Sequence, residues 1–211
     1  MISNILLLIS IGLVIFSYLI ILIKYFIYNK KRIDSYSGFD GAKEVTSNYD
    51  EINIVNSSDV IFSEYDAKRN VIRLNEKNYD GNSCFDVAVS MVLAGYSLVN
   101  INNDKYFKFK TLIRKIGYIS FCSLVGIVLS YFVSSIGDAK IGIVVLVLLG
   151  VYQYMRYQIA VLGNDEIKVV IDSDIYDKVG DVINSIISFN KLSFIVILLL
   201  IIRLVVIILG I

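Results

Sequence analysis

Long uncharged stretches of apolar residues constrain this chain more than any other feature of its sequence. Ile5 to Ile23 and Gly117 to Ile136 contain no charged residue. A helix needs roughly 20 mostly apolar residues to cross the roughly 30 Å hydrocarbon core of a bilayer, and both stretches meet that requirement. Two further stretches qualify, Ile141 to about Tyr157 and Leu192 to Ile211. With a mean hydropathy of +0.70 for the whole chain, the sequence predicts a mainly α-helical integral membrane protein with four transmembrane helices.

Basic residues are distributed unevenly between these predicted spans. Asn29 to Lys115 holds 13 Lys and Arg residues and Gly163 to Lys191 holds three, whereas Gly137 to Lys140 holds one. The residues before Ile5 hold none, and we interpret the first span as an uncleaved anchor. Because basic residues accumulate on the cytoplasmic side of a membrane, we expect residues 29–115 and 163–191 in the cytoplasm. Both termini are then on the opposite, outer side of the membrane.

The absence of histidine, the cysteine spacing and the net charge each exclude a class of function. The chain contains no histidine, so it has no imidazole general base, no Ser-His-Asp triad and no His-containing zinc site. The two cysteines, Cys84 and Cys122, lack the spacing of a zinc knuckle. The net charge of +1 argues against a nucleic-acid partner, which would require many basic contacts to phosphates. Because the chain lacks histidine and a zinc-knuckle cysteine spacing, we expect no cofactor.

Residues 29–82 show the pattern of a small cytoplasmic α/β module. Gly38 to Val45 predicts a turn and a short helix, and Asn53 to Val55 predicts a first strand. Val60 to Tyr65 and Asn70 to Leu74 flank a polar turn, which is typical of a β-hairpin.

A buried helix is predicted to follow the hairpin. Ser83 and Asp86 fit a capping box at its start, and Val87 to Val99 is apolar nearly all round, which indicates burial. Lys105 to Lys115 then alternates basic and aromatic residues. Such a segment favours the headgroup region, so membrane lipids are expected partners.

The predicted segments divide the chain into six parts. These are an anchor (1–28), the α/β module (29–82), the buried helix with the basic segment (83–116), a transmembrane hairpin (117–162), a cytoplasmic helical segment (163–191) and a last span (192–211).

Several residues in this order of elements match a known family. The matching positions are turn glycines, hairpin residues and residues before the buried helix: Gly38, Gly41, Ala42, Tyr65, Asp66, Arg73, Leu74, Tyr79 and Ser83. With the anchor, the transmembrane hairpin and the last span, they make the chain resemble the bacterial YugP-like neutral zinc metallopeptidases over essentially its whole length. The resemblance implies a zinc-binding catalytic helix at the position of the buried helix.

The zinc-binding motif of that family is degenerate in this chain. Family members carry His-Glu-x-x-His, in which histidines four residues apart bind zinc and the glutamate activates its water. Val92 and Tyr96 stand at the two histidine positions, and Leu93 stands at the position of the general base. None of the three can perform the original task of its position in zinc catalysis.

The third ligand of the family is a glutamate after the transmembrane hairpin. It aligns with Gly163, and the nearby acids Asp165 and Glu166 are weak metal candidates because carboxylates without a nitrogen partner suit zinc poorly. The resemblance therefore implies a catalytically inactive homologue, a pseudopeptidase. It would bind membrane polypeptides along a sheet edge at Val60–Tyr65 or Val71–Leu74, or partner an intact metallopeptidase paralogue.

Arg203 carries a charge into the last predicted span. Counting depth along each span places Ser17, Ser130 and Gln153 at similar heights, so they are expected hydrogen-bonding partners that stabilise helix packing. Two alternatives to the pseudopeptidase stay open. One is an active hydrolase whose metal ligands are other acids or come from another chain, and the other is a small transporter or channel subunit built around Arg203.

Overall fold

The structure is a computed structural model that describes residues 2–31, 33, 52–59, 63–102, 136–171 and 173–210. The predicted helix at Gly38 to Val45 and nearly all of the predicted span Gly117 to Ile136 lie outside the described residues, as does Ser130. The described part is mostly helical with one small sheet, as the sequence predicts. Its helices are α1 (Ile2–Lys30), α3 (Glu76–Asp80), α4 (Cys84–Asn102), α6 (Ile136–Val170) and α7 (Ser173–Leu209), and its strands are β1 (Asn53–Asn56), β2 (Glu64–Asp66) and β3 (Val71–Leu74).

The chain divides into two compact units. One, here the sheet unit, comprises Ile20–Phe107 and Gln158–Ser188, and the other, here the helical unit, comprises Met1–Leu19, Lys108–Tyr157 and Phe189–Ile211. The sheet unit contains all three strands, α3 and α4. The helical unit has its own apolar cluster, formed by Leu146, Leu149, Ile197 and Leu204.

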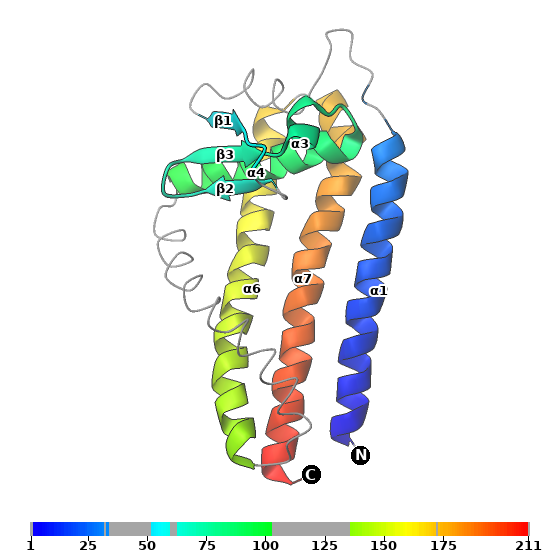
Figure 1. The fold of residues 1–211 in the computed structure, drawn as a ribbon, viewed down its shortest axis with the longest axis vertical. Helices are drawn as coiled ribbons and strands as arrows, with labels where there is room; N and C mark the ends of the chain where they lie inside the picture. The colour runs from blue at the N-terminus through cyan, green and yellow to red at the C-terminus, as the bar shows by residue number, and fades with distance from the viewer. Residues whose placement is uncertain are drawn as a thin grey trace. The chain divides into compact units, whose positions relative to one another are not determined.

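The three strands form a sheet in the order β1-β3-β2 (Figure 1). The predicted hairpin is confirmed: β2 pairs antiparallel with β3, with Tyr65 opposite Ile72. The predicted first strand is also present, and it pairs in parallel with β3. Because β3 lies in the centre, the expectation that Val71–Leu74 offers a sheet edge is wrong, and β1 and β2 are the outer strands.

The hairpin packs one face against α4, which lies behind the sheet in Figure 1. Alternation along the strands points Tyr65, Ile72 and Leu74 inward, where they are 9%, 0% and 0% exposed. Glu64 and Arg73 point outward and are only partly buried. Since α4 packs against the sheet on one side and against other helices of the sheet unit on the other, its nearly continuous apolar surface is buried.

The start of α4 follows the predicted capping box. The Asp86 backbone N–H donates to Ser83 Oγ at 3.1 Å, as expected of an N-cap serine. The Ser83 hydroxyl in turn donates to the Asp86 carboxylate. The acid is therefore bonded to the capping side chain itself.

Four described helices are long and apolar enough to cross a membrane: α1, α4, residues 142–170 of α6, and α7. They are not the same four as the predicted spans, because α4 is among them and Gly117 to Ile136 is not described. Only 11% of the apolar window of α1 is buried, whereas 67% of that of α4 is buried. Packing within the protein therefore accounts for the apolar surface of α4, while that of α1 remains exposed.

The helices α6 and α7 are longer than the predicted spans. The helix α6 continues through Gly163 to Val170, and α7 begins at Ser173 and continues through Lys191. Residues 163–170 and 173–191 are therefore helical, but they belong to two helices that also contain the apolar stretches.

Candidate functional site

The middle of α4 carries the three positions at which the family resemblance places two zinc ligands and a base. Val92 and Leu93 are 8% and 7% exposed, and Tyr96 is half-buried. Their neighbours Met91 and Ala94 are fully buried. This part of α4 belongs to the apolar core of the sheet unit, so its side chains offer packing surface where a peptidase would hold a metal.

Gly163 lies directly against α4 at Gly95, the residue before Tyr96 in the chain. A Cβ built on Gly95 would stand 2.6 Å from the Gly163 carbonyl oxygen and 2.8 Å from Ile167 Cδ1. A Cβ built on Gly163 would stand 2.9 Å from the backbone carbon of Gly95. The structure therefore brings together the two segments that the resemblance aligned with the catalytic helix and the third ligand. They meet backbone to backbone, with no room for a side chain between them.

The acids after Gly163 do not gather into a metal site. Asp165 is exposed and Glu166 is half-buried. The neighbouring buried residue Asn164 accepts a hydrogen bond from the Tyr176 hydroxyl at 2.8 Å, which ties α6 to α7. Among the described residues, no group of three or more Cys, Asp and Glu side chains is close enough to hold a metal ion.

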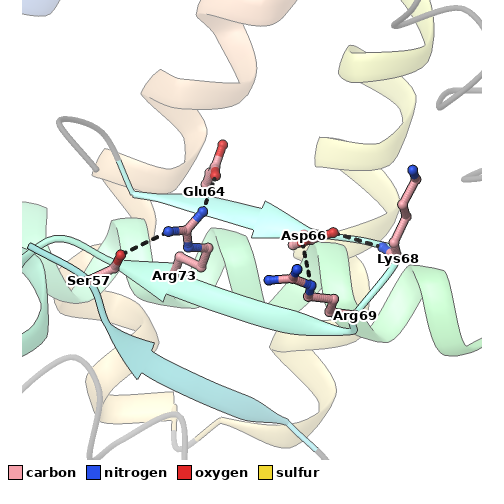
Figure 2. Close-up of polar contacts among 6 residues, drawn as sticks. All are labelled: Ser57, Glu64, Asp66, Lys68, Arg69 and Arg73. Carbon is pink, nitrogen blue, oxygen red and sulfur yellow. Dashed lines mark hydrogen bonds and ion pairs between the residues drawn. The ribbon is translucent and has the colours of Figure 1, made fainter. Parts of the chain in front are cut away.

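The outward face of the sheet carries polar contacts that join all three strands (Figure 2). Arg73 on β3 donates from Nη1 to Glu64 Oε1 on β2 at 3.4 Å and from Nη2 to Ser57 Oγ, just after β1, at 3.1 Å. Both partners of the ion pair are partly exposed, so it contributes little stability. At the turn, Asp66 Oδ1 accepts from the Lys68 N–H at 3.0 Å, which fixes the end of β2.

A polar network at the end of α4 attaches this helix to the hairpin turn. The Tyr65 hydroxyl donates to Asn70 Oδ1 at 2.7 Å and accepts from Asn100 Nδ2 at 2.7 Å. Ser97 Oγ also donates to Asn70 Oδ1, at 2.9 Å. Burial raises the pKa of Tyr65 above 10.0, and the hydrogen bonds from Ser97 and Asn100 oppose that effect.

A second network attaches the start of α4 to α3. Asn78 Nδ2 donates to Asp86 Oδ1 at 3.1 Å, and Asn78 Oδ1 accepts from Ser63 Oγ at 3.0 Å. Apart from the Ser83–Asp86 capping pair, these contacts were not predicted. Polar residues near the two ends of α4, Asp86 at the start and Ser97 and Asn100 at the end, are the signal that marks them.

Arg203 lies in the helical unit and is 4% exposed. Its Nε donates to the Ser3 carbonyl oxygen at 3.1 Å, in the first turn of α1. The expected partner Ser17 is buried, and its hydroxyl donates to the Leu13 carbonyl oxygen at 2.6 Å. Gln153 is half-buried in α6. Because the Ser3 acceptor is a backbone carbonyl, which every residue type carries, no side-chain pattern in the sequence marks this contact.

The described structure defines a class: a mostly helical chain with helices of membrane-spanning length and a small mixed sheet packed on a buried helix. Comparisons with protein-family models, with curated proteins and with solved structures found no match for this chain.

Proposed function

We propose that this protein is a membrane-anchored pseudopeptidase, related in form to the YugP-like zinc metallopeptidases, which binds an extended polypeptide segment without cleaving it. One observation supports the proposed loss of catalysis. The backbones of Gly95 and Gly163 are in contact at the place where the resemblance expects a metal between two segments. Val92 and Leu93 complete the apolar packing around it.

The binding surface in this proposal is the outer edge of β2. Within the described residues, β2 pairs with β3 alone, and an edge strand offers backbone N–H and C=O groups to an added strand. The inward side chain Tyr65 is anchored to Asn70 and Asn100. A rigid backbone at the edge lowers the entropic cost of pairing with a peptide.

The proposed location is the bacterial cytoplasmic membrane, with residues 29–115 and 163–191 in the cytoplasm and both termini outside. The exposed apolar surface of α1 supports the membrane placement, and the 13 basic residues between Asn29 and Lys115 support the orientation. The polypeptide bound at β2 then comes from the cytoplasmic side, or belongs to a membrane partner such as an intact metallopeptidase.

Metal analysis separates this proposal from an active hydrolase. The purified full-length protein in detergent should contain far less than one zinc per chain, and chelation should change neither its folding nor its peptide binding. A stoichiometric zinc whose removal abolishes a proteolytic activity would favour the hydrolase.

Hydrogen exchange tests the binding surface. A synthetic peptide of alternating valine and threonine should slow exchange of amides in Glu64–Asp66, because the added strand pairs with them. The same peptide with N-methyl groups on alternate residues should protect them less, since it lacks the required donors. Equal protection by both peptides would refute binding by strand addition.

Site-specific crosslinking adds a matched control. A photo-crosslinking residue in place of Glu64, on β2, should capture the unmethylated peptide. The same residue in place of Glu76, an exposed glutamate on α3, should not. Equal capture at both positions would place the peptide away from the β2 edge.

The transporter alternative makes a different prediction. It requires Arg203 to line a polar pathway, whereas its Nε donates to the Ser3 carbonyl oxygen within the helical unit. Flux in reconstituted vesicles that disappears in Arg203→Leu would favour the transporter.

A further inference from the structure

A polar cavity in the sheet unit lies between the last turns of α1 and the first half of α7. Its volume is about 260 Å³, and its lining residues are Lys24, Tyr28, Asp181, Asn184, Ser185 and Ser188. Drug-sized ligands occupy pockets of roughly 300–1,000 Å³, so this cavity suits a smaller polar group. All six lining side chains are polar, and none belongs to α4 or to the hairpin.

The position of Lys24 in the chain indicates the depth of the cavity in the proposed membrane arrangement. Lys24 is the first charged residue after the uncharged stretch Ile5 to Ile23, and Tyr25 and Tyr28 follow it. Lysine and tyrosine favour the level of the lipid headgroups, where an apolar helix leaves the hydrocarbon. The cavity therefore opens where phosphate groups of lipids are concentrated.

The two charges of the cavity differ in sign. Lys24 Nζ donates to Ser185 Oγ at 2.6 Å, and Ser185 Oγ donates to the Asp181 carbonyl oxygen at 2.6 Å. An ammonium carries three N–H donors, so this bond directs Lys24 while leaving donors for a ligand. Asp181 is an exposed carboxylate on the opposite helix. A site with one cation and one anion fits a ligand that also carries both charges.

We propose that this cavity binds the headgroup of phosphatidylethanolamine. The phosphodiester accepts hydrogen bonds from Lys24 and from the hydroxyl groups of Tyr28 and Ser188, and the primary ammonium of the lipid donates to Asp181 and to the Asn184 carbonyl. Phosphatidylglycerol has no cation for Asp181, and phosphatidylcholine has no N–H to donate. This inference rests on the proposed membrane placement of α1 and is independent of peptide binding at β2.

Native mass spectrometry of the full-length protein tests this inference. The protein is purified in detergent and offered equal amounts of phosphatidylethanolamine, phosphatidylcholine and phosphatidylglycerol with identical acyl chains. We expect phosphatidylethanolamine to be retained about tenfold more than either competitor, because one hydrogen bond to a charged group is worth roughly one decade in affinity. Equal retention of the three lipids would overturn the proposal.

Variants test the roles of the two charged residues, Lys24 and Asp181, in lipid binding. Lys24→Gln should lower retention of phosphatidylethanolamine, and Asp181→Asn should remove its advantage over phosphatidylcholine. The matched controls Lys30→Gln and Asp177→Asn change exposed residues on the same two helices that do not line the cavity, and should behave like the unmodified protein. Loss of selectivity in the controls, or its survival in both cavity variants, would refute the assignment.

Further measurements distinguish a membrane lipid from a soluble headgroup as the ligand, and a blocked cavity from a folding defect. Soluble glycerophosphoethanolamine should displace the lipid only at much higher concentration, and displacement at equal concentration would refute a membrane source. Ser188→Leu, at an exposed position, should block the cavity without changing its charge and should also abolish selectivity. An unchanged circular dichroism spectrum and thermal midpoint in these variants would show that they are folded, and unchanged lipid selectivity in Ser188→Leu would overturn the cavity assignment.

Discussion

At the scale of single residues, the contact between Gly95 and Gly163 decides what the middle of α4 can do. Each glycine has backbone atoms of the other where its own Cβ would be, so the two helices approach as closely as backbones allow. Gly95 lies one residue before Tyr96, within the stretch Val92–Tyr96 that the resemblance aligns with a zinc-binding motif. Any residue with a metal-binding side chain at Gly163 would have to push the helices apart.

A methyl group at this contact should therefore destabilise the protein. Gly95→Ala places a Cβ 2.6 Å from the Gly163 carbonyl oxygen, and relief requires backbone movement, which costs about 1–3 kcal/mol in a well-packed core. Thermal unfolding in detergent, followed by helical circular dichroism, should show a lower midpoint. The control Gly150→Ala meets Ile197 Cγ2 at 3.4 Å and should leave the midpoint unchanged or slightly raised; equal midpoints for the two variants would contradict the close contact.

The burial and contacts of these residues were only partly predictable from the sequence. The apolar pattern from Val87 to Val99 predicts that Val92 and Leu93 are buried, and they are. The meeting of Gly95 with Gly163 is not contained in any local pattern, because residues 68 positions apart leave no periodic signal. Only the family resemblance linked Gly163 to this helix.

At the scale of elements, α4 is held by polar contacts at both ends and by apolar packing between them. Asp86 bonds to Ser83 and Asn78 at its start, and Ser97 and Asn100 hold the hairpin turn near its end. Unsatisfied buried polar groups are costly, so the networks fix the position of the hairpin along α4. The β2 edge is thereby held in a defined place relative to the helix.

Removing the Tyr65 hydroxyl tests this attachment and its pH dependence. Tyr65→Phe removes one hydrogen bond from Asn70 and one from Asn100, which keep their bonds to Ser97 and to the Ala67 carbonyl oxygen. It should lower the free energy of unfolding by about 1 kcal/mol at neutral pH. Because the pKa of Tyr65 is raised in the folded state, its contribution is complete below pH 10 and declines as pH rises through the folded pKa. The stability difference between the two proteins, measured in detergent from pH 7 to 11, should shrink above about pH 10. A difference that stays constant or grows would contradict the raised pKa.

Some features of the strands and helices could be predicted from the sequence, and others could not. Alternation and a polar turn predict β2 and β3, because an antiparallel hairpin is a local structure. The parallel pairing of β1 with β3 was not predicted, since such a pair needs a crossover and depends on distant segments. The absence of proline permits helices as long as α6 and α7, but the charges after Arg156 and before Leu192 suggested separate segments.

At the scale of the whole molecule, helix length and charge together constrain how the chain meets a membrane. At about 1.5 Å per residue, the 35 residues of α6 and the 37 residues of α7 extend for more than 50 Å, well beyond a hydrocarbon core of roughly 30 Å. Their charged ends, around Asp165 and Asp181, belong to the sheet unit. Each helix is therefore longer than one crossing of the hydrocarbon requires.

The proposed orientation is tested by labelling introduced cysteines from outside the cell. In a background in which Cys84 and Cys122 are replaced by alanine, Gly210→Cys should react with a membrane-impermeant maleimide in intact bacterial cells. Lys68→Cys, at the exposed turn of the hairpin, should react only after permeabilisation, because the proposed orientation, based on the 13 basic residues of the 29–115 segment, puts that segment in the cytoplasm. Ile2→Cys, at the other end of the chain, should behave like Gly210→Cys. Labelling of Lys68→Cys in intact cells would reverse the orientation, and a peptide bound at β2 would then have to come from outside the cell.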